Sequence, residues 1–70
     1  MPYINIKVTD EGVSRQQKEL LISGVTELLQ DVLGKDPKFT HVVIDEIPTD
    51  NWGVTGMTTT EFREKESNND

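Results

Sequence analysis

The sequence contains no cysteine and a single histidine, His41. Disulfide bonds are therefore excluded, and His41 has no second histidine or clustered carboxylate at the spacing that a structural zinc site requires. The chain has 70 residues, enough for one domain that buries only about 60% of the surface it exposes when unfolded. Because such a core is marginal, we expect the chain to gain stability by oligomerising.

Basic residues and long apolar runs are also scarce. Seven Lys and Arg stand against 13 Asp and Glu, so the net charge is −6. This charge argues against nucleic acid or an anionic membrane as a partner. No apolar run approaches the roughly 18 residues of a transmembrane span, and the N-terminus lacks the basic and long apolar regions of a signal peptide. We therefore expect a cytoplasmic protein.

The first eight residues alternate in polarity, as a β-strand with one buried face does. Ile4, Ile6 and Val8 share a face, and Pro2 has the same parity. If Met1 is removed, Pro2 carries a free secondary amine, and burial in an apolar, cation-lined cleft would lower the pKa of that amine towards neutrality. Pro2 is thus a candidate general base. Met-Pro starts are also common, and the alternative is that this one has no catalytic meaning.

An amphipathic helix follows the polar turn 9–13. Ser14 is a favourable N-cap, and Gln17, three residues further on, completes a capping box. Gly34 suits the position just beyond the helix, and Pro37 prevents the helix from resuming. We interpret the apolar stripe as core rather than as a free binding surface; it comprises Leu21, Val25, Leu28, Leu29 and Val32, widened by Leu20, Ile22 and Leu33.

A second strand is predicted over Phe39–Ile47, between Pro37 and Pro48, because this stretch is rich in β-branched residues. Its nearly continuous apolar middle favours burial on both faces. Strand, helix and strand form a β-α-β unit with parallel strands and a right-handed crossover. Two strands alone leave open edges, so we expect a second subunit to complete the sheet of this α+β fold.

The remaining residues comprise a short extended region with glycines and, after it, a polar tail. Short extended pieces over Trp52–Thr60, with glycines between them, predict a C-terminal hairpin. Trp52 either anchors an interface or walls a ligand cleft. We expect the domain to span residues 1–62. The polar tail 63–70 has no apolar residue, so it is either frayed or held only by a neighbour.

Taken together, these features resemble the 4-oxalocrotonate tautomerase family. The similarity runs from Pro2 to about Gly56: a Met-Pro start on a strand, a helix begun by Ser14, a second strand, and an aromatic-Gly-x-x-Gly turn at Trp52-Gly53-Val54-Thr55-Gly56. The resemblance implies a β-α-β unit with a terminal hairpin. It also implies subunits that pair across their sheets into dimers, which typically assemble as homohexamers.

The resemblance further implies a reaction. A free amine at Pro2 would take a proton from the carbon beside a carbonyl and return it elsewhere on a small 2-oxo or enol acid, with no metal or organic cofactor. Fixed donors would stabilise the enolate that forms. Trp52 occupies the aromatic position that keeps the cleft dry and the amine weakly basic.

Two positions depart from the family pattern. Val13 and His41 stand where the family has arginines. A valine cannot bind a carboxylate, and a histidine is only partly charged at neutral pH. Arg15, just inside the helix, is a candidate replacement or a solvated first-turn residue. His41 either acts on the substrate, by donating a hydrogen bond to an oxyanion or protonating a leaving position, or it faces water or a subunit contact.

Two alternatives remain beside the tautomerase hypothesis. One is a non-catalytic or weakly active oligomeric ligand-binding member of the same fold, which lost the arginines. The other is a hydratase or dehalogenase, which needs a carboxylate to orient water; Asp45, Glu46 and Glu11 are the candidates.

Overall fold

The computed structural model describes residues 1–68. Two strands and a helix form the larger part, in the order β1 (Tyr3–Thr9), α1 (Arg15–Leu33) and β2 (His41–Ile47). A short 3₁₀ turn, η1 (Pro37–Phe39), precedes β2, and a second, η2 (Thr49–Asn51), follows it. The chain then forms the hairpin strands β3 (Gly53–Val54) and β4 (Met57–Thr58) and the helix α2 (Thr59–Asn68).

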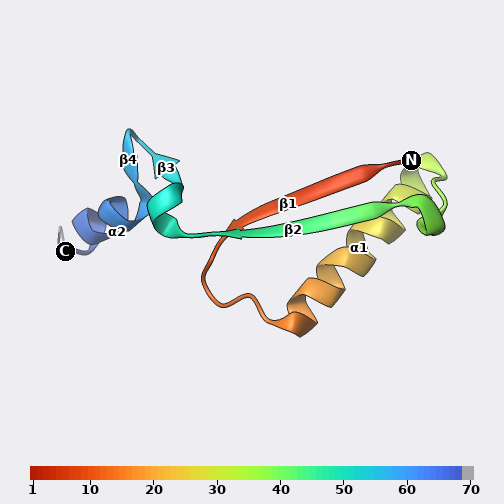
Figure 1. Cartoon of the computed structure of the whole chain (residues 1–70), viewed down its shortest axis with the longest axis horizontal. Coiled ribbons are helices and arrows are strands. Elements are labelled where there is room, and N and C mark those ends of the chain that lie inside the picture. The colour runs from red at the N-terminus through yellow and green to blue at the C-terminus, as the bar shows by residue number, and fades with distance from the viewer. Residues whose placement is uncertain (69–70) are drawn as a thin grey trace.

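The predicted β-α-β unit is confirmed. β1 and β2 pair in parallel, with Tyr3 opposite His41 and Thr9 opposite Ile47. The sheet contains only these two strands within the described residues, and α1 lies along one of its faces (Figure 1). Completion of the sheet by a second subunit stays a prediction.

The predicted limits of α1 are confirmed as well. The Gln17 N–H donates to the Ser14 hydroxyl at 3.1 Å, and the Ser14 N–H donates to the Gln17 side-chain oxygen at 2.8 Å. These bonds satisfy two N–H groups that have no partner within the helix. At the other end Gly34 adopts φ +66°, and its N–H donates to the Gln30 carbonyl at 2.9 Å. A left-handed residue at this point favours glycine.

The second strand starts two residues later than predicted, at His41 rather than Phe39. Pro37 opens η1 instead, and the Asp36 carboxylate accepts a hydrogen bond from the Lys38 N–H at 2.9 Å. Proline has the backbone angle of a helical turn, so the first residue of the predicted strand, Phe39, ends η1 instead. Burial of β2 on both faces does not occur within one chain, where Val43 is 42% exposed.

The hairpin is confirmed, but it is shorter than predicted. Thr55 and Gly56 connect β3 to β4 with φ values of +51° and +80°, and two positive φ values are what a tight hairpin turn requires. The extended region ends at Thr58, whose hydroxyl accepts the Glu61 N–H at 3.1 Å and begins α2.

The polar stretch beyond Phe62 is therefore helical rather than frayed. α2 runs through the boundary predicted at residue 62 and continues to Asn68, supported by an ion pair between Lys65 and Glu61 at 3.5 Å. Residues 69–70 of the predicted tail lie outside the described residues. The division into a domain and a tail stays a prediction.

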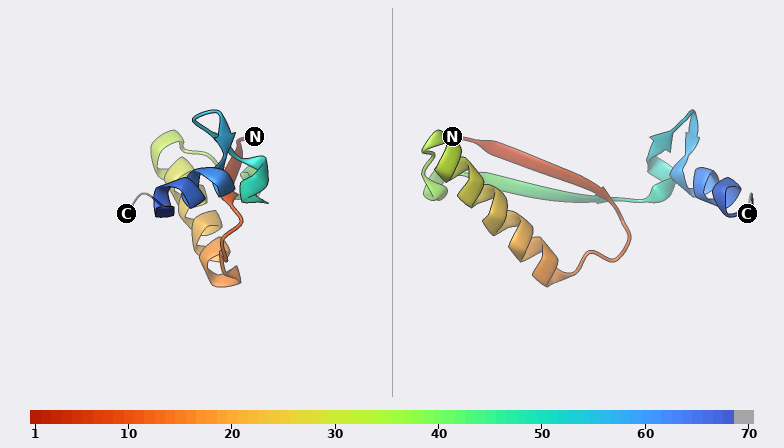
Figure 2. Two further views of the ribbon diagram at one scale, coloured as in Figure 1. Left: turned by 90° about the vertical axis from the view of Figure 1, so that its left-hand side faces the viewer. Right: turned by 180° about the vertical axis from the view of Figure 1, so that it is seen from behind.

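The chain is elongated, with extents of 48 × 25 × 19 Å (Figure 2). Its radius of gyration is 16.2 Å, whereas a compact chain of this length would have about 11 Å. No hydrophobic residue among those described is fully buried. None of the described helices is long and apolar enough to cross a membrane.

The apolar stripe of α1 is only partly core, which corrects the sequence interpretation. Val25 and Leu29 are half-buried on the sheet side. Leu20, Leu28 and Val32 form a ridge at intervals of four or eight residues and remain 65%, 58% and 69% exposed. A sheet of two strands is too narrow to cover the whole apolar stripe of α1.

Candidate functional site

Pro2 lies at the end of the sheet where both strands begin. Its carbonyl accepts a hydrogen bond from the His41 N–H at 3.1 Å, which extends the β1–β2 pairing by one step. Pro2 is half-buried, whereas the preceding Met1 is 85% exposed. Loss of Met1 would therefore remove little packing.

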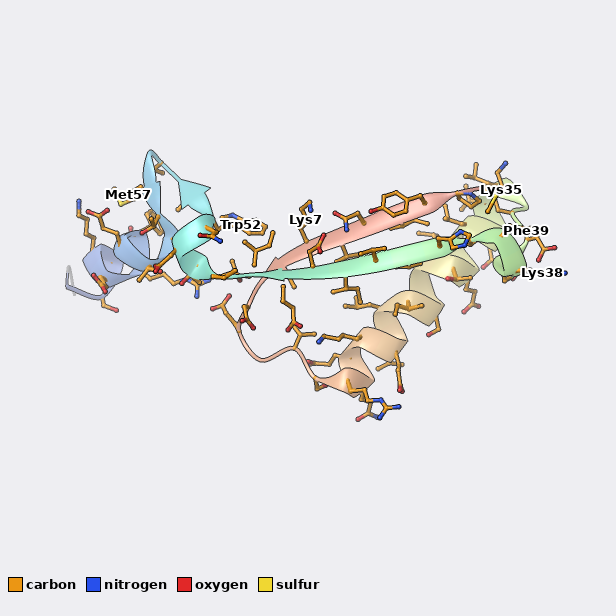
Figure 3. All side chains as sticks on the ribbon, in the orientation of Figure 1. Lys7, Lys35, Lys38, Phe39, Trp52 and Met57 are labelled. Carbon is orange, nitrogen blue, oxygen red and sulfur yellow. The ribbon has the colours of Figure 1, made fainter. Side chains whose placement is uncertain are left out.

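His41 is brought next to Pro2 by this pairing. It is the first residue of β2, lies opposite Tyr3 and is exposed. Lys35 and Lys38 lie at the same end of the molecule (Figure 3). Asp36, between them in the sequence, carries the opposite charge, so residues 35–38 add one net positive charge to this end.

The sheet face that points away from α1 carries an ordered polar strip. The Asn5 amide donates to the Asp45 carboxylate at 2.9 Å, and the Lys7 ammonium donates to the same oxygen at 3.0 Å. Lys7 points away from α1 (Figure 3). The Asn5 hydrogen bond, followed by that of Lys7, holds the pKa of Asp45 below its usual range. Asp45 is thus held as an anion by its neighbours.

Trp52 lies at the opposite end of the sheet, beside the hairpin (Figure 3). Its carbonyl accepts the Thr59 N–H at 2.8 Å and the Thr59 hydroxyl at 2.7 Å, and the indole is half-buried. It borders an open cleft of about 420 Å³ lined by Val8, Thr9, Trp52, Val54, Thr59, Phe62 and Arg63. The cleft therefore has an aromatic wall, further apolar walls and one cation.

Arg63 reaches this cleft from α2 and is held by Glu11 of the loop before α1. Both terminal nitrogens of Arg63 donate to the Glu11 carboxylate, the second at 3.1 Å, and the Thr9 hydroxyl donates to Glu11 as well. The Arg63 hydrogen bond, followed by that of Thr9, lowers the pKa of Glu11 to about 2. The carboxylate in turn raises the pKa of Arg63.

Known proteins resemble the chain closely in sequence and in fold. The family model described as "Tautomerase enzyme" matches residues 2–61. The chain belongs to the tautomerase family. The protein named "Probable tautomerase K2" of Dickeya dadantii is 54% identical to this tautomerase-family chain over 67 residues, which is 96% of this chain and 100% of that protein.

Two solved structures share the fold of this tautomerase-family chain. The crystal structure of DmpI from Helicobacter pylori aligns with a TM-score of 0.84 and 38% identity, covering 90% of this chain and 97% of that one. TomN, a 4-oxalocrotonate tautomerase homologue in the tomaymycin biosynthetic pathway, aligns with a TM-score of 0.83 and 28% identity, covering 90% and 95%. The resemblance predicted from the sequence is confirmed.

The four predicted site residues of this tautomerase-family protein are not gathered in one chain. Pro2 and His41 lie at one end of β1, and Trp52 lies at the other, separated by a strand that spans roughly 20 Å. Arg15 points into solvent at the start of α1, with a side chain 94% exposed and paired with Glu19 at 3.4 Å. Arg15 therefore lies neither beside Pro2 and His41 nor beside Trp52.

Arg63 was missed by the sequence interpretation, which assigned it to a polar tail. The available signal was local: Thr58 is a good cap, and Phe62 follows it by one helical turn. Nothing in the sequence, however, places position 63 beside position 11. That contact depends on where α2 lies.

The three carboxylates considered for water activation all have basic partners. Glu46 pairs with Lys18 at 2.6 Å, Asp45 with Lys7, and Glu11 with Arg63. Within residues 1–68, no three metal-ligating side chains of the His, Cys, Asp or Glu type come together. Acid–base chemistry by these three carboxylates would first require breaking an ion pair.

Proposed function

We propose that this protein is a keto–enol tautomerase that needs no cofactor, with the free amine of Pro2 as its general base and acid. The observation that carries the proposal is the family match, which begins at Pro2 itself. The half-burial of Pro2 and the exposure of Met1 support it. The substrate would be a small 2-oxo or enol acid.

The reaction moves one proton and leaves the molecular formula unchanged. The lone pair of the Pro2 nitrogen takes a proton from the carbon beside the carbonyl, and the carbonyl becomes an enolate. The resulting ammonium returns the proton to another atom of the conjugated system. An ordinary α-amino group has a pKa of about 7.7–8.0, so a modest lowering by apolar surroundings and nearby cations gives both forms at neutral pH.

We further propose that two copies of the chain build each site. Both strands of the parallel pair have one open edge, and unpaired edges readily pair with another chain. Antiparallel pairing about a two-fold axis would bring the Pro2 end of one sheet to the Trp52 cleft of the other. The same pairing would place the two α1 helices side by side and cover the ridge of Leu20, Leu28 and Val32.

Replacement of Pro2 by alanine tests the mechanism. General acid–base catalysis contributes about 10²–10⁴-fold to a rate, so Pro2→Ala should slow ketonisation of phenylenolpyruvate by at least about 100-fold. Pro48→Ala, which removes an exposed proline elsewhere, serves as the control and should stay near the wild-type rate. An intact mass must first establish that Met1 is absent from each preparation. A Pro2→Ala variant as fast as the control would refute the proline mechanism.

The replacements at Val13 and His41 favour a second function, that of a ligand-binding member without turnover. Titration of the Pro2 nitrogen by ¹⁵N NMR separates the two. A pKa at or below neutrality indicates a site tuned for proton transfer, whereas titration like free proline favours the binding function.

A further inference from the structure

The cleft beside Trp52 carries a cation whose role the proton transfer leaves unexplained. Arg63 is the one basic residue among those that line it, and the other walls include Val8, Trp52, Val54 and Phe62. An apolar cleft with one guanidinium suits a ligand with an apolar body and an acidic end. Val13, at the position before α1 where the resemblance implies an arginine, offers no charge to such a ligand.

We propose that Arg63 binds the carboxylate of the acidic substrate in the cleft walled by Trp52. This inference rests on the proposed function, because it names the group that orients the substrate for proton transfer. Arg63 would contact the ligand directly, and Glu11 would act as a positioning residue.

The hydrogen-bonding capacity of Arg63 allows this role. A guanidinium has five N–H donors, and the Glu11 carboxylate accepts one from each terminal nitrogen. Three donors therefore remain for a second anion. The Arg63 side chain is 52% exposed, so a ligand in the cleft can approach it without displacing Glu11.

The surroundings of Glu11 make Arg63 a fixed rather than a mobile cation. Glu11 belongs to the loop before α1, accepts from Thr9 at the end of β1, and joins this loop to α2. The guanidinium is thus held by a carboxylate that is itself bonded to Thr9, which lines the cleft. A fixed donor loses less side-chain entropy on binding than a free one.

An exposed ion pair is often only a structural link between two elements. The two roles predict different results for Glu11→Gln, which breaks the ion pair and keeps the cation. A purely structural link makes Glu11→Gln and Arg63→Gln equally harmful. A binding role makes Arg63→Gln harmful, whereas Glu11→Gln keeps the cation and should weaken carboxylate binding less, by the loss of positioning alone.

Trp52 provides a direct readout because it is the only tryptophan in the chain. Its fluorescence is titrated with 3-phenylpropanoate and, separately, with the neutral 3-phenylpropanamide, using the assembled full-length protein. Arg63→Gln and Glu11→Gln are compared with Lys65→Gln. This control removes a cation of the same helix that is paired with Glu61 and does not line the cleft.

Saturable binding of the carboxylate by the wild type is expected to weaken about 10- to 100-fold in Arg63→Gln, the range for a hydrogen bond to a charged group. Lys65→Gln should stay within about twofold, and amide binding should depend on Arg63 less than carboxylate binding does. Equal carboxylate affinity in Arg63→Gln and Lys65→Gln would overturn the inference. The inference would also be overturned by equal wild-type affinity for carboxylate and amide, by the absence of a saturable response, or by Glu11→Gln weakening carboxylate binding as much as Arg63→Gln does.

Glu11→Gln keeps the test decisive if Arg63→Gln fails to fold, as judged by circular dichroism. Pro2→Ala separates this inference from the proposed function. Carboxylate binding that depends on Arg63, in a wild type without tautomerase activity, would support the binding residue and refute the proposed reaction. Tautomerase activity together with carboxylate binding that does not depend on Arg63 would support the proposed reaction and refute Arg63 as the binding residue.

Discussion

Truncation of Leu28 tests the two-chain site at a position far from the chemistry. Leu28 lies on the outer ridge of α1 and is 58% exposed in the single chain. Gly24, one helical turn earlier, has no atom within 4 Å of the position that a Cβ would occupy. The ridge therefore has room for another helix to approach closely.

The expected loss follows from the area that remains to be buried. Full burial of a leucine side chain is worth about 1.5–3 kcal/mol, so the exposed fraction of Leu28 corresponds to about 1–2 kcal/mol per chain. Each residue occurs twice in a two-fold interface. Leu28→Ala should therefore weaken a dimer by about 2–4 kcal/mol, or roughly 30- to 900-fold in its dissociation constant.

Sedimentation velocity over a dilution series measures this constant. Gln30→Ala is the matched control, because it shortens an exposed polar side chain on the opposite side of α1 and leaves the ridge intact. Tautomerase activity should fall in the same concentration range as the assembly, because the proposed site takes Pro2 and Trp52 from different chains. An assembly as tight as that of the control would refute the ridge as an interface. Full activity in the dissociated chain would refute the two-chain site.

Two further predictions concern stability. The pKa of Glu11 is about 2 in the folded protein against an ordinary 4.5, so the ion pair with Arg63 stabilises fully above about pH 4.5 and loses this effect as the pH falls towards 2. The melting temperature of Glu11→Gln should thus lie below that of the wild type by a constant amount above pH 5, and the gap should close near pH 2; a gap independent of pH would contradict this. Ser14→Ala removes the acceptor of the Gln17 N–H and should lower the free energy of unfolding by about 1 kcal/mol, measured by urea titration at fixed protein concentration. A much smaller change would mean that water replaces the Ser14 hydroxyl as the acceptor for the Gln17 N–H.

The sequence was sufficient for the features that depend on neighbouring residues. Ser14, Gln17 and Gly34 define α1 because capping bonds join residues three or four apart. The alternation in β1 places Ile4, Ile6 and Val8 away from the face that carries Lys7 and Asp45. The order of elements, with Pro2 at the start of a strand, identified the family and the candidate base.

The tertiary structure decided what depends on distant residues. α2 lacks a clear apolar period, so its helix follows from the Thr58 cap and from packing beside Trp52 rather than from a pattern. Its position brings Arg63 to Glu11, 52 residues earlier in the chain. The length of the parallel strands sets Pro2 apart from Trp52. Which residues share a cleft is therefore a property of how the elements lie in space, because no local rule fixes a contact between residues so far apart in sequence.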